Sequence, residues 1–74
     1  MLVERGIRVL DKEVVSDAYA IASNYLRRAG AMPGHVITDE RLLNIIVRLF
    51  HEGEINRIKL ANYAIAAYEA AELG

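Results

Sequence analysis

The chain has 74 residues, 54% of them apolar, and no cysteine, which allows one globular domain at most and excludes disulfide bonds and thiolate metal sites. Nine Lys and Arg are balanced by ten Asp and Glu, for a net charge of −1, and this balance argues against a dedicated binder of nucleic acid or anionic membrane, which usually carries a cationic surplus. No apolar run approaches the roughly 18 residues that span a bilayer, and charged residues interrupt the N-terminus where a signal peptide would be apolar, so we expect a cytoplasmic protein.

Residues 1–10 are predicted to be a short N-terminal arm, because Gly6 discourages a helix that would extend backward from the next element. The arm is rich in large apolar residues, namely Leu2, Val3, Ile7 and Val9. Leaving such side chains in water is unfavourable, so we expect the arm to pack on the helices of its own chain or to reach a partner chain. Residues 11–74 then form a single helical domain.

The first helix is predicted over residues 11–29. Asp11 can cap its start, Arg27 in its last turn complements the helix dipole, and Gly30 can end it in the left-handed conformation. Apolar residues recur at three- and four-residue spacing and form one stripe for the core: Val14, Val15, Ala18, Ala22, Tyr25, Leu26 and Ala29.

A second helix is predicted over residues 39–52, with Thr38 as its cap and Gly53 at its end. Its apolar residues are Leu42, Leu43, Ile45, Ile46, Val47, Leu49 and Phe50. At about 100° per residue, they cover roughly 200° of the helix surface. An arc of this width has to contact partners on two sides, which indicates a central core helix that also contacts a second subunit.

The third helix is predicted over residues 54–72 and is rich in alanine, which has the highest helix propensity. Its apolar residues form two adjacent stripes, one with Ile58, Ala61, Ile65 and Tyr68 and the other with Leu60, Ala64, Ala67 and Ala71. Small residues on two sides let neighbouring backbones approach closely, which suits a helix between two packing partners. The three helices together predict an all-α fold, a small three-helix bundle.

The function expected from this pattern is a non-enzymatic protein–protein interaction module, most simply a homodimer. Obligate homodimer interfaces resemble a protein core cut in half, with large aliphatic residues, small residues and few charges. The apolar excess of the second helix and the alanine stripe of the third helix match this description. The predicted interface residues are Leu43, Val47, Phe50, Leu60, Ala64 and Ala67.

A helix-turn-helix-like DNA-binding regulator is the alternative, because the second helix, a one-glycine turn and the third helix follow one another as in that unit. Side chains that suit bases and phosphates stand at the start of the third helix: Asn56, Arg57, Lys59, Asn62 and Tyr63. The motif usually has a small residue four positions before its glycine and a branched apolar residue six positions after it. This chain has Leu49 and Lys59 there, so a nucleic-acid partner is not favoured.

Catalysis and metal binding have little support in the sequence. His35 and His51 are the only histidines, and neither belongs to a spacing that would gather three or four metal ligands. No glycine-rich phosphate loop is present, and no histidine stands close in sequence to a serine that could act as a nucleophile. We therefore expect no enzyme activity, no metal and no cofactor.

Overall fold

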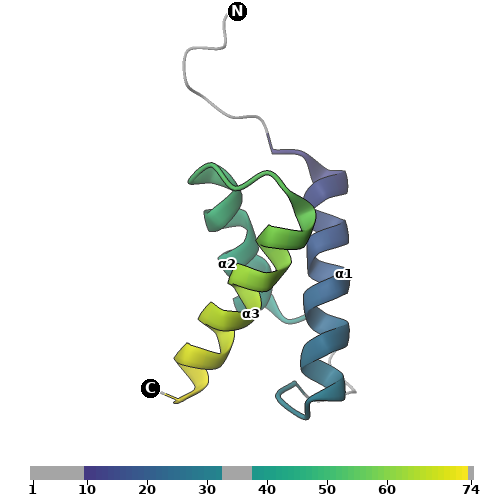
Figure 1. Ribbon diagram of the computed structural model, residues 1–74, viewed down its shortest axis with the longest axis vertical. Helices are drawn as coiled ribbons and strands as arrows, with labels where there is room; N and C mark the ends of the chain where they lie inside the picture. Colours follow the sequence, from purple (N-terminus) through teal and green to yellow (C-terminus); the bar gives the residue numbers. More distant parts are fainter. Residues whose placement is uncertain (1–9, 33–37, 74) are drawn as a thin grey trace, which may run out of the picture.

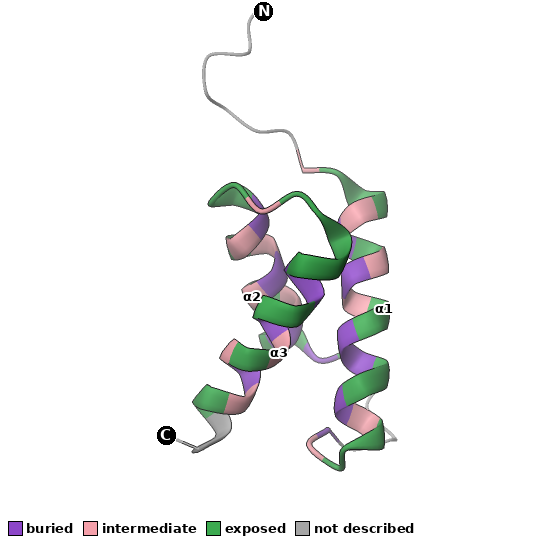
Figure 2. Ribbon diagram, in the orientation of Figure 1, coloured by how far each residue is buried: buried purple, intermediate pink, exposed green. Residues whose placement is uncertain are grey.

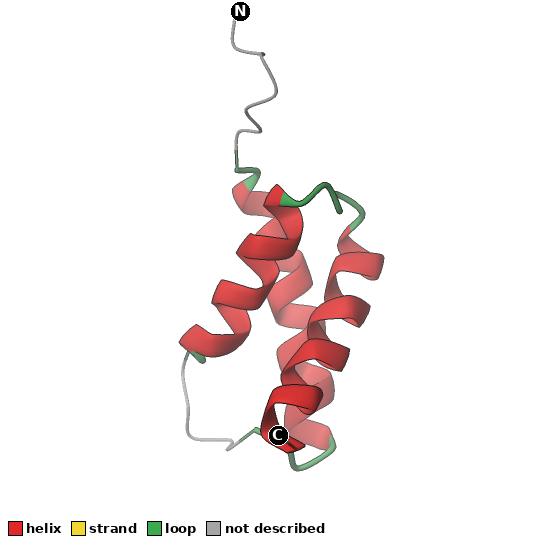
Figure 3. Cartoon of the chain, turned by 90° about the vertical axis from the view of Figure 1, so that its left-hand side faces the viewer, coloured by secondary structure: helices red, strands yellow, loops and turns green. Residues whose placement is uncertain are grey.

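The computed structural model describes residues 10–32 and 38–73, with the backbone alone for residues 72 and 73. Its helices are α1 (Lys12–Arg28), α2 (Glu40–His51) and α3 (Arg57–Leu73). Figure 1 shows α1 and α3 running in the same direction and α2 running in the opposite one. Each helix packs against the other two, and Figure 3 shows helices and loops as the only elements in the described ranges. The predicted all-α three-helix bundle is confirmed.

The predicted N-terminal arm lies outside the described residues, apart from Leu10, which packs half-buried against the core. Asp11 follows as the N-cap of α1, as predicted. Its Oδ1 accepts hydrogen bonds from the backbone N–H groups of Glu13 at 3.0 Å and Val14 at 3.3 Å. These bonds satisfy donors that the first turn of a helix otherwise leaves unpaired, so local chemistry explains where α1 begins.

The start of α2 corrects the prediction that Thr38 is its cap. The N-cap is Asp39, whose Oδ1 accepts hydrogen bonds from the backbone N–H groups of Arg41 at 3.0 Å and Leu42 at 3.3 Å. A capping side chain has to reach the N–H groups two and three residues ahead. Asp39 meets that requirement for a helix beginning at Glu40, whereas Thr38 precedes the cap and is exposed.

The start of α3 also differs from the prediction, because the helix begins at Arg57 and not at Glu54. Asn56 caps it: its Oδ1 accepts hydrogen bonds from the backbone N–H groups of Ile58 at 2.9 Å and Lys59 at 3.0 Å. The Glu54 carboxylate in turn accepts a hydrogen bond from the Asn56 N–H at 3.0 Å. Asparagine favours caps over helix interiors because its side chain competes for backbone hydrogen bonds, and the helix starts after it.

The predicted ends of α1 and α2 at Gly30 and Gly53 are confirmed by their backbone conformations. The two glycines have φ angles of +78° and +121°, a region that residues with a side chain rarely adopt. After each helix, the N–H groups of the glycine and of the next residue donate to carbonyls of the last turn, at 2.8 to 3.1 Å. This pattern is the Schellman motif, and it needs the left-handed glycine to turn the chain.

The core lies between the three helices, where Figure 2 shows the buried segments. Its buried apolar residues are Val15, Ala18, Ala22, Leu26, Met32, Leu42, Ile46, Phe50, Leu60, Ala61, Ala64 and Tyr68. The wide apolar arc of α2 is largely covered within one chain, because its other members, Leu43, Ile45, Val47 and Leu49, pack half-buried against this core. The width of that arc therefore does not by itself require a second subunit.

Two polar contacts lie along the path of α3 across the other helices. At its start, the Arg57 guanidinium forms an ion pair with Asp17 of α1. Near its end, the Tyr68 hydroxyl donates to Asp39, the cap of α2. Figure 1 shows the result: α3 begins beside α1, and its C-terminal half runs away from α1. One side of the later turns of α1 is therefore left uncovered by α3.

Candidate interaction surface

The structure places half of the predicted interface inside the core of a single chain. Phe50 is 3% exposed, and Leu60 and Ala64 are 0% exposed. These three residues cannot form a docking surface on the folded chain, because the other helices already cover them. The remaining members, Leu43, Val47 and Ala67, are half-buried. The error has a physical source, since an apolar stripe looks the same whether its own chain or a partner covers it.

The residues proposed for nucleic-acid binding are all exposed, but two of them are engaged within the chain. The Oδ1 of Asn56 caps α3, and Arg57 is paired with Asp17. Lys59, Asn62 and Tyr63 remain exposed on the first turns of α3. DNA binding stays a prediction from the sequence. Two of the five side chains predicted to contact DNA, Asn56 and Arg57, already bind other groups of the chain.

The large apolar residues that stay exposed point to a different surface. They are Ile21 at 36%, Tyr25 at 51%, Ile55 at 55%, Ile58 at 54% and Tyr63 at 51% exposed. Residues four apart share a helix face, so Ile21 and Tyr25 follow Asp17 along one side of α1, at one and two turns. Ile58 directly follows Arg57, the partner of Asp17. We name Ile21, Tyr25 and Ile58 the α1–α3 patch, since these exposed residues stand on α1 and in the first turn of α3, two helices that pack against each other.

The sequence assigned Tyr25 and Ile58 to core stripes, and for both residues this prediction is wrong. The stripes themselves are real, because their neighbours Ala22, Leu26 and Ala61 are buried. Figure 1 shows that the C-terminal half of α3 runs away from α1 and does not cover the later turns of α1, to which Tyr25 belongs. That path depends on contacts between residues distant in the sequence, so the spacing along a single helix carried no signal for the patch.

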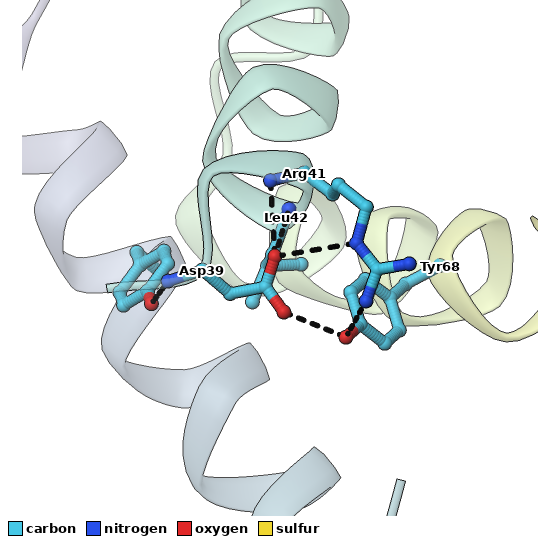
Figure 4. Close-up of polar contacts among 5 residues, drawn as sticks. Asp39, Arg41, Leu42 and Tyr68 are labelled. Carbon is cyan, nitrogen blue, oxygen red and sulfur yellow. Dashed lines mark hydrogen bonds and ion pairs between the residues drawn. The ribbon is translucent and has the colours of Figure 1, made fainter. Parts of the chain in front are cut away.

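A second feature that the sequence did not indicate is a polar cluster of Tyr19, Asp39, Arg41 and Tyr68, of which Figure 4 labels Asp39, Arg41 and Tyr68. The Tyr68 hydroxyl donates to Oδ2 of Asp39 at 2.7 Å and accepts from the Arg41 guanidinium at 3.0 Å. The backbone N–H of Asp39 donates to the Tyr19 hydroxyl at 2.7 Å. These bonds join side chains of α1, α2 and α3 at one point, and both carboxylate oxygens of Asp39 are occupied. The cluster links the three helices to one another through hydrogen bonds.

The carboxyl group of Asp39 has a pKa below its ordinary value of 3.8. Burial alone raises this pKa, but hydrogen bonds from the Tyr68 hydroxyl and from the backbone N–H groups of Leu42 and Arg41, together with the charge of Arg41, outweigh burial. The ionised form is thus better stabilised in the folded chain than in the unfolded one. Its contribution to stability is complete above the unfolded pKa and is lost as the pH falls through the folded pKa.

We therefore expect the free energy of unfolding to fall as the pH is lowered from about 5 to about 2, in part through Asp39. Urea unfolding at several pH values, in the wild type and in Asp39→Asn, measures that part. The variant keeps a side-chain oxygen for the cap but cannot titrate, so its stability should depend less steeply on pH below about 4. Identical slopes in the two proteins would show that Asp39 titrates alike in the folded and unfolded states.

The histidines and acidic residues offer no metal site among the residues that the structure describes. His51 is exposed at the end of α2, with its ring centroid 6.0 Å from that of Phe50 in an edge-on arrangement. His35 lies outside the described residues. Within the described ranges, no three His, Asp or Glu side chains are grouped so that they could hold a metal ion.

Within residues 10–32 and 38–73, no helix has both the length and the apolar character needed to cross a bilayer. Comparison of the chain with protein-family models, curated proteins and solved structures finds no match. The function is therefore inferred from the exposed surface of the three-helix bundle itself.

Proposed function

We propose that this chain is a non-enzymatic protein–protein interaction module that forms a homodimer through the α1–α3 patch. The exposure of Ile21, Tyr25 and Ile58 on two helices in contact carries the proposal. Large apolar residues that stay exposed on a surface favour binding of another protein, because their burial releases water. Tyrosine is enriched at such sites, where its ring is buried and its hydroxyl stays at the rim. We expect the module to act in the cytoplasm.

A second copy of the chain is the partner that charge and size favour. The net charge of −1 opposes self-association only weakly. A domain of 74 residues has a small core, and such domains often gain stability by forming oligomers. In a two-fold dimer the same patch is used by both copies, so one cluster of apolar residues supplies both halves of the interface. The exposed Asp17–Arg57 ion pair lies beside the patch, as charged residues do at interface rims.

The molar mass in solution, measured by light scattering over a concentration series, tests the dimer. We expect a mass near twice 8.3 kDa for the wild type at high concentration. Tyr25→Ser and Ile58→Ser should raise the dimer dissociation constant by about tenfold or more, because each removes a large apolar contact.

Tyr63→Ser is the matched control, since Tyr63 has the same 51% exposure as Tyr25 but lies outside the patch. It should leave the dissociation constant unchanged. A wild type that stays monomeric would overturn the proposed homodimer. If Tyr63→Ser dissociates the dimer and Tyr25→Ser does not, the interface lies on the face of α3 that carries Tyr63 and not at the α1–α3 patch.

A further inference from the structure

One face of α1 carries opposite charges at its two ends. Its residues follow one another at spacings of four, three and four, and they are Asp17, Ile21, Asn24 and Arg28. At about 100° per residue, this spacing keeps them within an arc of roughly 60°, as in the contact seam of paired helices. Asn24 and Arg28 are exposed. Ile21 is 36% exposed, and the side chain of Asp17 is 42% exposed. We name these four residues the α1 stripe.

The charges at the two ends of the α1 stripe do not neutralise each other within one chain. At a rise of about 1.5 Å per residue, Asp17 and Arg28 stand about 16 Å apart along the helix, roughly twice the Debye length at physiological ionic strength. Asp17 pairs with Arg57 through one carboxylate oxygen, Oδ2, and a carboxylate can accept from more than one guanidinium group. None of the described residues forms an ion pair with Arg28. Arg28 is therefore available to an acidic group of another molecule.

A second copy of the chain carries an acidic group at the matching position. When two copies pack α1 against α1 in opposite directions, the spacing of the stripe sets Arg28 of each copy opposite Asp17 of the other. The same register sets Ile21 of each copy opposite Asn24 of the other. Packing in the same direction would place like charges opposite each other at both ends of the stripe, which is unfavourable. The charges of the α1 stripe therefore favour packing in opposite directions.

We propose that the two copies of the homodimer pair α1 against α1 in opposite directions, with Arg28 of each copy bound to Asp17 of the other. This inference rests on the proposed function and adds to it the orientation of the copies and two ion pairs between them. The arrangement brings Tyr25 within about one helical turn, along the helix axis, of the contact between Asp17 and Arg57 in the other copy. Ile58 directly follows Arg57, so the α1 stripe and the α1–α3 patch belong to one interface.

Apolar and charged residues have different roles in this interface. Exposed ion pairs add little to affinity, so the affinity comes from burial of Ile21, Tyr25 and Ile58. The ion pairs select the direction of pairing, because only one direction brings opposite charges together. Asn24 has a similar effect, since a polar residue within a contact seam specifies how two helices pair at a cost in stability.

Charge reversal followed by mixing tests the pairing, with the dimer dissociation constant measured by light scattering. Arg28→Glu should raise this constant about tenfold or more, because it places two acidic residues opposite each other at both ends of the interface. The double variant Asp17→Lys with Arg57→Glu reverses the other member of the pair and keeps an ion pair within the chain. It should raise the constant by a similar factor, since the introduced lysine faces Arg28. An equimolar mixture of the two variants should regain the wild-type constant, because opposite charges then meet at both ends.

Arg48→Glu is the matched control, because it makes the same change of charge at an exposed position of α2. It should leave the dissociation constant close to that of the wild type, and circular dichroism of every variant should match the wild type before mixing. Equal effects of Arg28→Glu and Arg48→Glu would overturn the pairing of α1 with α1, and so would a mixture that stays dissociated. In both cases the wild type is still a dimer, and the proposed function stands. A monomeric wild type would overturn the homodimer itself, and the pairing with it.

Discussion

Asp39→Ala is expected to lower the free energy of unfolding by about 2–4 kcal/mol, a large part of the stability of so small a domain. The substitution removes the N-cap of α2, which costs about 1 kcal/mol. It also takes away the acceptor of the Tyr68 hydroxyl, whose residue is 2% exposed. The hydroxyl still accepts from Arg41, but a buried O–H group left without an acceptor adds about 1–3 kcal/mol. Urea unfolding followed by circular dichroism gives the total.

Asp11→Ala is the control for the cap alone. Asp11 and Asp39 cap their helices with hydrogen bonds of the same lengths, 3.0 Å and 3.3 Å, but Asp11 is exposed. We expect its replacement to cost about 0.5–2 kcal/mol. The excess cost at Asp39 then reports the buried contact with Tyr68.

A double-mutant cycle with Tyr68→Phe isolates that contact. The phenylalanine keeps the ring in the core and removes the hydroxyl that donates to Asp39 at 2.7 Å. We expect a coupling energy of about 1 kcal/mol or more between the two positions, because they share one buried hydrogen bond. Additive effects would show that the polar cluster does not stabilise the packing of α3 on α2.

Local chemistry accounts for most of what could be predicted about the fold. The helices follow from apolar periodicity, and Asp11, Gly30 and Gly53 act where backbone conformation or capping requires them. The error at the start of α2 has the same local origin, since Thr38 and Asp39 are both good capping residues and stand side by side. Periodicity and capping preferences alone therefore leave an uncertainty of one to a few residues at a helix end.

The candidate surface could not be predicted, because it depends on where α3 crosses the other helices. Tyr25 and Ile58 satisfy the spacing of core residues, yet each is more than half exposed. Along this crossing Asp17 pairs with Arg57 and Asp39 bonds to Tyr68, and the members of each pair are far apart in the sequence. No periodicity within one helix contains this information.

Phe50→Ala is expected to destabilise the chain by about 3–5 kcal/mol, which for a domain of this size amounts to extensive unfolding. Phe50 is 3% exposed within one chain, and its removal leaves a cavity among the buried residues of the three helices. Leu49→Ala on the same helix is the control: Leu49 is half-buried, and its loss should cost about 1 kcal/mol. Urea unfolding of both variants measures the difference.

The concentration dependence of that loss distinguishes a core residue from an interface residue. If Phe50 acts in the core of one chain, the loss of stability persists in samples diluted until the wild type is monomeric. A residue at a dimer interface would behave differently, because its truncation would leave the monomer folded and change only the dissociation constant. A Phe50→Ala variant that stays fully folded as a monomer would therefore contradict the burial of Phe50 and return this residue to the interface predicted from the sequence. Unfolding at every concentration would keep Phe50 in the core and leave association to the exposed apolar residues, the α1–α3 patch among them.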